Sequence, residues 1–372
     1  MNNPFIYIQT IDEFKQFKDN VAGCSIVGID TEFDRTRTYW PDLCLLQVAT
    51  PSTIFVIEPQ AFDLPWLSNF MANNEIIKIF HSCRQDLEAF YALFGTIPQN
   101  VFDTQVAATL VGMADQISYA DLCQNLLQVQ LCKEFQWSNW TKRPLLPQQI
   151  DYAANDVRYL ASLYQELTRQ LQQTEHHQLM YRIMSAYEDM ATYQKNARRY
   201  FMNKLYHPSM TLDHASILYQ LVEWREQYCQ THNIMRRLVF EDKDLQKIIP
   251  TQLFADFLPE HAMREILHQV VKNAQNNQEI PLFLQIQNIG HPIKAIHTKI
   301  KSILEPLKIP IHYVITQDMM IDFLLQPSHE TNPLFNSWRH TLLQPCWDRL
   351  LMIKSKFQAQ QNQGKNSNEN VS

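Results

Sequence analysis

Glycine is scarce in this chain, with only six in 372 residues. Neither G-x-G-x-x-G nor a G-x-x-x-x-G-K loop occurs. The sequence therefore lacks the usual motifs for dinucleotide binding of the Rossmann type and for phosphate-binding loops. The nucleophile pattern G-x-S-x-G is absent too. We therefore expect any chemistry to come from side chains, most simply from carboxylates with a metal ion.

Cysteine pairs and long apolar runs are also missing. The seven cysteines are an odd set without a C-x-x-C pair, which argues against a disulfide framework and against a thiolate zinc site. No apolar run approaches the roughly 18 residues of a membrane helix, and the first ten residues do not resemble a secretory signal. We expect a cytoplasmic protein with no membrane segment and no obligate protein partner.

The charge is unevenly distributed. Residues 1–170 contain 11 basic and 19 acidic residues, a balance of −8, whereas residues 171–372 contain 21 and 19, a balance of +2. Proteins that bind polyanions are normally basic. A nucleic-acid role would therefore need local basic patches, or metal ions that neutralise the acidic half.

Strand-like and helix-like segments alternate in the first 170 residues. Thr10 and Glu13 form a capping box that predicts a helix from Ile11. We predict strands at 5–8, 25–32, 43–49, 53–58, 76–80 and 101–102, and helices at 84–94, 104–111 and from about 147 onward. This pattern predicts an α/β domain with a mixed sheet.

Strand signals disappear after this point. We predict a helical linker at 176–210 and helices at 213–230, 242–249, 259–274, 299–307, 316–325 and 337–357, with a break at 290–292. The predicted organisation is an α/β domain at 1–175, the linker, and two all-α domains at 211–291 and 292–358. The Gln/Asn-rich segment 359–372 is expected to be disordered.

Four acids and one tyrosine form the candidate site. Asp30 and Glu32 lie two residues apart near the end of a predicted strand, so they share one side of it. Asp86 lies in the first turn of a predicted helix, and Tyr152 and Asp156 are spaced i and i+4 on another. Taken singly, each has an ordinary alternative: a solvent-facing strand end, a helix-dipole contact, or a pair on a half-buried helix.

Together these groups indicate a metal site. Hard divalent cations such as Mg²⁺ and Mn²⁺ take oxygen ligands, and two such ions about 4 Å apart can support an in-line phosphoryl displacement. A phenol hydroxyl beside the acids can orient the attacking water.

Five ordered motifs in residues 5–170 carry a family resemblance. They are G-I-D-T-E-F from Gly28, H-S-C-R-Q-D from His81, F-D-T-Q-V-A-A from Phe102, W-T-K-R-P-L from Trp140, and Y-A-A-N-D-V from Tyr152. The segment resembles the ribonuclease D family of DEDD 3′→5′ exonucleases, in the subgroup with a Y-x-x-x-D motif. The resemblance implies a ribonuclease H-like fold.

The same resemblance implies roles for the candidate residues. Asp30, Glu32 and Asp156 would hold one divalent cation, Asp30 and Asp86 a second, and Tyr152 would orient the water. The implied activity is metal-dependent 3′→5′ exoribonuclease cleavage that releases nucleoside 5′-monophosphates. Its implied substrates are structured RNAs, chiefly tRNA precursors with 3′ extensions.

The second half extends the resemblance. Leu221 to Leu245 resembles an HRDC domain, the helical nucleic-acid module of the same family, although Met235 stands where proline is expected before the Arg pair. Lys301 to Met352 resembles the family's second, more divergent helical domain.

Several basic and aromatic residues are candidates for RNA contacts. Arginine forks match phosphate oxygens, which favours Arg35 and Arg37, and interleaved aromatic and basic residues favour Trp140 and Arg143. A solvated loop and a loop anchored by buried tryptophan are the respective alternatives. Further candidates for a phosphate-tracking surface are basic residues of the second half, among them Arg236 and Arg237.

Two further motif residues are expected to have structural roles, His81 as a satisfied strand-end histidine and Thr104 as a helix cap. Two rival functions remain open at this point: a DNA-directed exonuclease on the same fold, and a non-catalytic RNA-binding protein.

Overall fold

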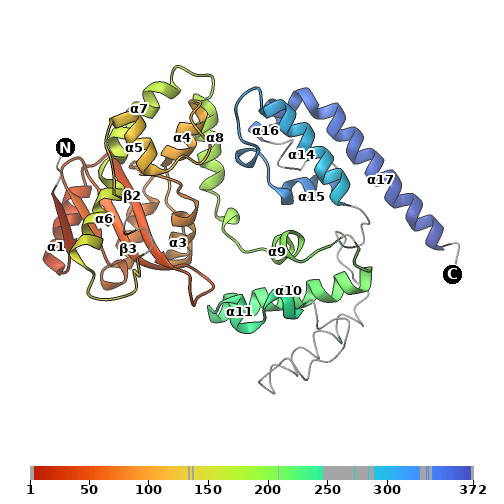
Figure 1. The fold of residues 1–372 in the computed structure, drawn as a ribbon, viewed down its shortest axis with the longest axis horizontal. Coiled ribbons are helices and arrows are strands. Elements are labelled where there is room, and N and C mark those ends of the chain that lie inside the picture. Colours follow the sequence, from red (N-terminus) through yellow and green to blue (C-terminus); the bar gives the residue numbers. More distant parts are fainter. Residues whose placement is uncertain are drawn as a thin grey trace. The chain divides into compact units, whose positions relative to one another are not determined.

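The computed structural model describes residues 4–132, 135, 138–207, 209–245, 272, 284, 289–326, 332, 334 and 337–369. The chain divides into two units, residues 1–194 and residues 195–372 (Figure 1). The first unit contains a sheet with flanking helices. In the second unit, the part of the chain that the structure describes contains helices and no strand, as predicted.

A six-stranded mixed sheet forms the centre of the first unit. Its strand order is β1-β4-β3-β2-β5-β6, and β3 is antiparallel to both neighbours while the other pairs are parallel. The predicted mixed α/β sheet is therefore confirmed. The strands are β1 (Phe5–Ile8), β2 (Ile26–Asp34), β3 (Asp42–Ala49), β4 (Ile54–Ile57), β5 (Ile77–Phe80) and β6 (Val101–Asp103).

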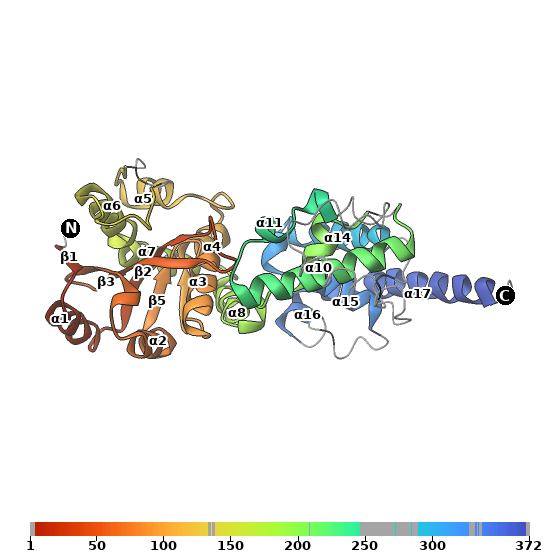
Figure 2. The same ribbon diagram turned by 90° about the horizontal axis from the view of Figure 1, so that it is seen from below.

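Helices cover both faces of this sheet (Figure 2). Helices α1, α2 and α3 lie on one face, and α6 and α7 lie on the other. The helices are α1 (Ile11–Val21), α2 (Leu64–Ala72), α3 (Arg84–Phe94), α4 (Thr104–Leu110), α5 (Tyr119–Leu127), α6 (Pro147–Arg158), α7 (Leu160–Leu171) and α8 (His177–Tyr187), with 3₁₀ turns at Pro59–Ala61 and Met190–Thr192. The predicted capping box of Thr10 and Glu13 opens α1.

The long helix predicted from residue 147 is two helices, because it breaks at Tyr159. The backbone N–H of Tyr159 donates to the hydroxyl of Tyr119 at 3.0 Å, and that hydroxyl donates to the carbonyl of Asn155 at 3.3 Å. The phenol thus takes the place of one i to i−4 bond of the helix, which is a recognised cause of kinks. Apolar spacing continues across the break, so periodicity could not reveal it.

Helix α8 also differs from the prediction, which treated residues 176–210 as a linker. Met180, Ile183 and Met184 are buried, and α8 packs against α4 and β6 within the first unit. These residues form an apolar stripe at helical spacing, so α8 has an apolar face that is buried against its neighbours.

The second unit contains two groups of packed helices. Helix α10 packs against α9 and α11, and α14 packs against α15 and α17. The helices are α9 (Ala197–Lys204), α10 (Leu212–His232), α11 (Arg236–Val239), α14 (Gly290–Leu304), α15 (Gln317–Leu325), α16 (Trp338–Leu343) and α17 (Trp347–Glu369), with 3₁₀ turns at Ile311–Tyr313 and Gln344–Cys346. The helix predicted at 259–274 and most of the one at 242–249 lie outside the described residues.

Three features of this unit differ from the sequence prediction. The helix predicted at 337–357 is two helices, α16 and α17, separated by the 3₁₀ turn at Gln344–Cys346, which contains a proline. Gly290 and Pro292, predicted as a break, begin α14, since proline is tolerated in the first turn, where its missing N–H has no helical partner. Helix α17 continues to Glu369, although residues from 359 onward were predicted to be disordered. This stretch contains no proline to end the helix, and elongation of a formed helix adds one hydrogen bond for each residue fixed.

None of the helices in the described part of the chain is long and apolar enough to cross a membrane.

Candidate active site

Strand β2 presents the first two acids. Asp30 and Glu32 project from the same face of the sheet and are half-buried. On that face, a Cβ atom at Gly28 would lie 3.1 Å from the Cβ atom of Leu160. The absence of a side chain at residue 28 therefore lets the junction of α6 and α7 lie directly against β2, and this close approach brings Asp156 toward the two acids.

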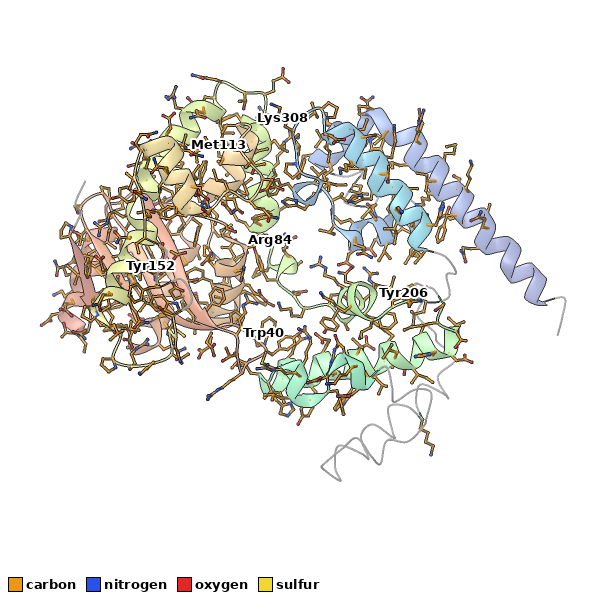
Figure 3. The ribbon with its side chains drawn as sticks, in the orientation of Figure 1. Trp40, Arg84, Met113, Tyr152, Tyr206 and Lys308 are labelled. Atoms are coloured by element: carbon orange, nitrogen blue, oxygen red, sulfur yellow. The ribbon has the colours of Figure 1, made fainter. Side chains whose placement is uncertain are left out.

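Three carboxylates converge at this junction. One oxygen from each of Asp30, Glu32 and Asp156 lies within 4.8 Å of the others. Tyr152, one turn before Asp156 on α6, shares a side-chain hydrogen bond with it, and its ring centroid lies 6.3 Å from that of Trp140. Figure 3 places Tyr152 over the sheet of the first unit. The structure thus brings together four of the five predicted residues.

The fifth predicted residue, Asp86, approaches from the opposite face of the sheet. It lies in the first turn of α3, is 6% exposed, and accepts a hydrogen bond from the hydroxyl of Thr31. Thr31 stands between Asp30 and Glu32 in the sequence, so its side chain points to the α3 face. Asp86 is not part of the three-oxygen group, but the charge of Asp30 contributes to its raised pKa.

A buried aspartate holds the loop before α3. The Asp103 carboxylate accepts the backbone N–H groups of Ser82 at 2.9 Å and of Cys83 at 2.8 Å. It also caps α4, the role predicted for Thr104. The ring of His81 bonds the Thr104 hydroxyl at 2.9 Å, which agrees with a structural role. Sequence reasoning did not identify Asp103, although it lies within the F-D-T-Q motif.

The acids of this site are protonated more readily than ordinary carboxyls. Burial raises the pKa of Asp30 and of Asp86 well above the usual range, and the charge of Asp156 adds to the effect at Asp30. Burial, followed by the charges of Asp30 and Asp156, raises the pKa of Glu32 to about 10. Burial raises the pKa of Asp156 to about 7.

No salt bridge in the described part of the chain reaches any of these four carboxylates. A cluster of this kind is short of positive charge, and carboxylate oxygens are the ligands that hard divalent cations prefer. The donor set therefore fits a divalent metal ion.

The arginines after β2 lie at the edge of this region. Arg35 donates from Nη2 to Glu88 at 2.7 Å, its guanidinium stacks over the ring of Phe33, and its side chain is 36% exposed. Arg37 is exposed. Both positions are compatible with a solvated loop and with phosphate contact.

The other predicted pair has structural partners. Trp140 is 6% exposed, so its ring faces are not open to a base. Arg143 donates to Glu58 at 2.8 Å, to the carbonyl of Trp140 at 2.7 Å and to that of Cys44 at 3.1 Å. These contacts describe a loop anchored by buried tryptophan, and RNA contact by Trp140 and Arg143 stays a prediction.

Arg236 and Arg237 of the second unit differ from each other. Arg236 forms a forked pair with Glu226, at 2.5 Å and 2.6 Å, and stacks over the ring of Tyr200. Glu226 is only 2% exposed, so Arg236 balances a buried charge. Arg237 is exposed.

Gln47 is a neighbour of the site that sequence reasoning missed. It pairs with Asp30 across β2 and β3, so the two side chains leave the same face of the sheet. Gln47 is fully buried, and neither its amide nitrogen nor its amide oxygen has a hydrogen-bond partner. Its signal in the sequence is a lone polar residue within the apolar run L-C-L-L-Q-V-A.

The chain is similar to known proteins in its sequence and in its fold. Residues 5–172 match the 3′-5′ exonuclease family. The chain is 37% identical over 227 residues to a protein named Ribonuclease D from Granulibacter bethesdensis, covering 60% of this chain and 57% of that protein. It is 29% identical over 355 residues to the Ribonuclease D of Bartonella henselae, covering 89% of this chain and 86% of that protein.

The first of these alignments thus spans less than two thirds of the relative. A longer match comes from solved structures. The crystal structure of Escherichia coli RNase D, titled an exoribonuclease involved in structured RNA processing, superposes with a TM-score of 0.79 and 23% identity over 95% of this chain and 99% of that chain. The two chains share a fold in both their sheet-containing and helical parts.

Proposed function

We propose that this chain, whose residues 5–172 match the 3′-5′ exonuclease family, is a metal-dependent 3′→5′ exoribonuclease of the ribonuclease D type. The observation that carries the proposal is the convergence of Asp30, Glu32 and Asp156 within 4.8 Å, beside Tyr152. The similarity to proteins named Ribonuclease D supports RNA as the substrate class.

Two divalent cations, Mg²⁺ or Mn²⁺, are the proposed cofactors. Asp30, Glu32 and Asp156 would hold one, and Asp30 with Asp86 would hold the other. When bound, such ions supply charge that stabilises the attacking and leaving oxygens of a phosphodiester. Asp30 is common to both sets, which agrees with its central place among the acids.

Tyr152 is the proposed orienting group for the attacking water. Burial raises the pKa of its phenol, with smaller contributions from Asp156 and Glu32, so the hydroxyl stays neutral at physiological pH. A neutral hydroxyl fixed through Asp156 can hold water in line with the last phosphorus of the RNA. The water oxygen then gives up a proton and bonds to phosphorus, and the bond to the 3′ oxygen of the preceding nucleotide breaks. That 3′ oxygen takes a proton, so the products are a nucleoside 5′-monophosphate and a chain one residue shorter.

The helical second unit is proposed to contain the HRDC domain and its divergent partner, with boundaries near 211–291 and 292–358. Helices α10, α14, α15 and α17 and the resemblance of Leu221 to Leu245 support this assignment. The proposed physiological substrates are 3′-extended tRNA precursors and other structured RNAs, with Arg35 and Arg37 as proposed phosphate contacts in the nuclease unit.

Incubation with a 3′-extended tRNA, with and without EDTA, tests this function. The expected products are nucleoside 5′-monophosphates and a ladder of RNAs shortened from the 3′ end, formed only when a divalent ion is present. Equal cleavage of a matched substrate with a deoxyribose 3′ end would favour a DNA-directed enzyme. RNA binding without cleavage under any metal condition would favour a non-catalytic protein.

A further inference from the structure

A groove between α14 and α17 gathers positive charge in the second unit. Its volume is about 490 Å³, and Lys294, Lys299 and Arg349 line it together with His291. None of the nine residues that line the groove is acidic. Helix α14 itself contains three lysines and two histidines and no carboxylate.

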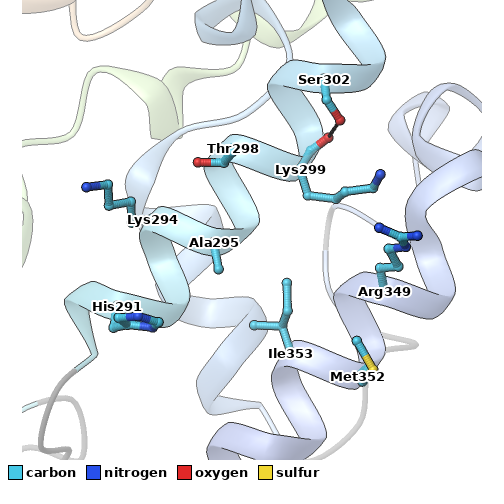
Figure 4. Close-up of a pocket in the computed structure, with 9 residues that line it drawn as sticks. All are labelled: His291, Lys294, Ala295, Thr298, Lys299, Ser302, Arg349, Met352 and Ile353. Atoms are coloured by element: carbon cyan, nitrogen blue, oxygen red, sulfur yellow. Dashed lines mark hydrogen bonds between the residues drawn. The ribbon is translucent and has the colours of Figure 1, made fainter.

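Two of these cations face each other. Figure 4 shows the side chains of Lys299, from α14, and Arg349, from α17, directed toward one another across the groove. In the part of the chain that the structure describes, no acidic side chain pairs with either of them. Like charges that converge without a counter-charge are stabilised by an anion between them.

Apart from Thr298 and Ser302, the other residues that line the groove are apolar. Ala295, Met352 and Ile353 lie between the cationic groups (Figure 4), and Met352 is half exposed. An anion that also carries flat apolar groups matches both features. A strand of RNA has this chemistry, because each phosphate is followed by a ribose and a base that stacks on apolar side chains.

We propose that this groove binds the phosphodiester backbone of a single RNA strand, with a phosphate between Lys299 and Arg349 and the adjoining nucleoside over Ala295 and Ile353. The proposal rests on the RNA-directed function above and adds a site outside the acidic nuclease unit. It supplies local positive charge for a protein whose first 170 residues have a balance of −8.

Binding of an unstructured, labelled RNA of about 20 nucleotides, measured by fluorescence anisotropy in EDTA, tests the groove without cleavage. One phosphate contact on a single strand has a salt slope of about 0.7, which corresponds to roughly fivefold in affinity at 0.1 M salt. Lys299→Gln should therefore weaken binding about fivefold, and Lys299→Gln with Arg349→Gln about 25-fold, with the slope falling by about 0.7 for each.

Lys301→Gln is the matched control, because Lys301 lies on the same helix and is exposed but does not line the groove. It should change affinity less than about twofold. Lys299→Glu guards against a folding artefact, since the new carboxylate would pair with Arg349 and keep the thermal midpoint at or above that of the wild type. Its RNA affinity should nevertheless fall further than that of Lys299→Gln.

Equal effects of Lys299→Gln and Lys301→Gln, or no effect of either, would overturn the proposal. Competition by poly-glutamate at the same charge concentration as RNA would show instead a site for acidic peptides. A parallel assay with Mg²⁺ and a short oligonucleotide separates this result from the proposed function. Failure of the wild type to cleave it would refute the exoribonuclease and leave the binding result intact.

Discussion

Asp30→Asn should inactivate the protein and also stabilise it when no metal is present. Asp30 is the like-charged neighbour that contributes to the raised pKa of Glu32, Asp86 and Tyr152. An amide of the same shape removes this charge without leaving a cavity. The buried acids then repel each other less, while a shared metal ligand is lost.

The size of the effect follows from the spacing of the acids. Two unit charges about 4.8 Å apart, as in the group of Asp30, Glu32 and Asp156, repel by about 3.5 kcal/mol at an effective dielectric constant of about 20. Only part of this repulsion acts at neutral pH, because Glu32 with a pKa of about 10 is mostly protonated. We expect a gain of about 1–2 kcal/mol in the free energy of unfolding, or roughly 2–8 °C in the melting temperature of a unit of this size.

Thermal unfolding in EDTA measures the stability gained without metal, and thermal unfolding in Mg²⁺ measures the stabilisation by metal that the variant loses. In EDTA the variant should melt above the wild type. In Mg²⁺ the wild type should gain stability by mass action and the variant should gain much less. Cleavage of RNA by the variant should fall below a tenth of the wild-type rate.

Asp151→Asn provides the control, since Asp151 lies on the same helix as Asp156 but is exposed. It should change stability by less than about 0.5 kcal/mol in either buffer. A lower melting temperature of Asp30→Asn in EDTA would refute the reasoning, because it would mean that the Asp30 carboxylate stabilises the fold in the absence of metal.

Three further outcomes are expected. Tyr152→Phe should lower the rate of RNA hydrolysis at least about tenfold, while the Mg²⁺ concentration for half-maximal activity stays unchanged, since only the hydroxyl is lost. The fold raises the pKa of Glu32 from 4.5 to about 10. The contribution of Glu32 to stability is therefore complete below pH 4.5 and is lost as the pH rises toward 10. Urea unfolding in EDTA should show this decline in the wild type and a shallower decline in Glu32→Gln. Gly28→Ala should destabilise the protein by about 1–3 kcal/mol in urea and lower its activity, because the new Cβ atom would press on Leu160 and displace α6 from β2.

The proximity of four of the five candidate residues could be predicted from the sequence, because the spacing rules are local. Asp30 and Glu32 share a strand face by the period of two, and Tyr152 and Asp156 share a helix face by the i, i+4 rule. Each prediction needs only the correct element type. The structure places these four residues together.

The supporting contacts could not be predicted in this way, because each joins residues distant in sequence. The pairing of Gln47 with Asp30 depends on the register between β2 and β3. The ion pair of Arg236 with Glu226 depends on how two helices fold back on each other, and no sequence pattern reveals it. The composition showed which charged residues are present, but it could not show which residues they pair with.

The break between α6 and α7 has a consequence for the site itself. Asp156 lies three residues before Tyr159, where the hydroxyl of Tyr119 enters the helix from 40 residues away. The same junction lies on Gly28, in close approach to β2. The carboxylate of Asp156 is therefore positioned by two contacts: the glycine admits the helix, and the phenol binds at its break. Neither contact adds charge to the site. Together they can hold the carboxylate of Asp156 close to Asp30 and Glu32, although these carboxylates repel each other.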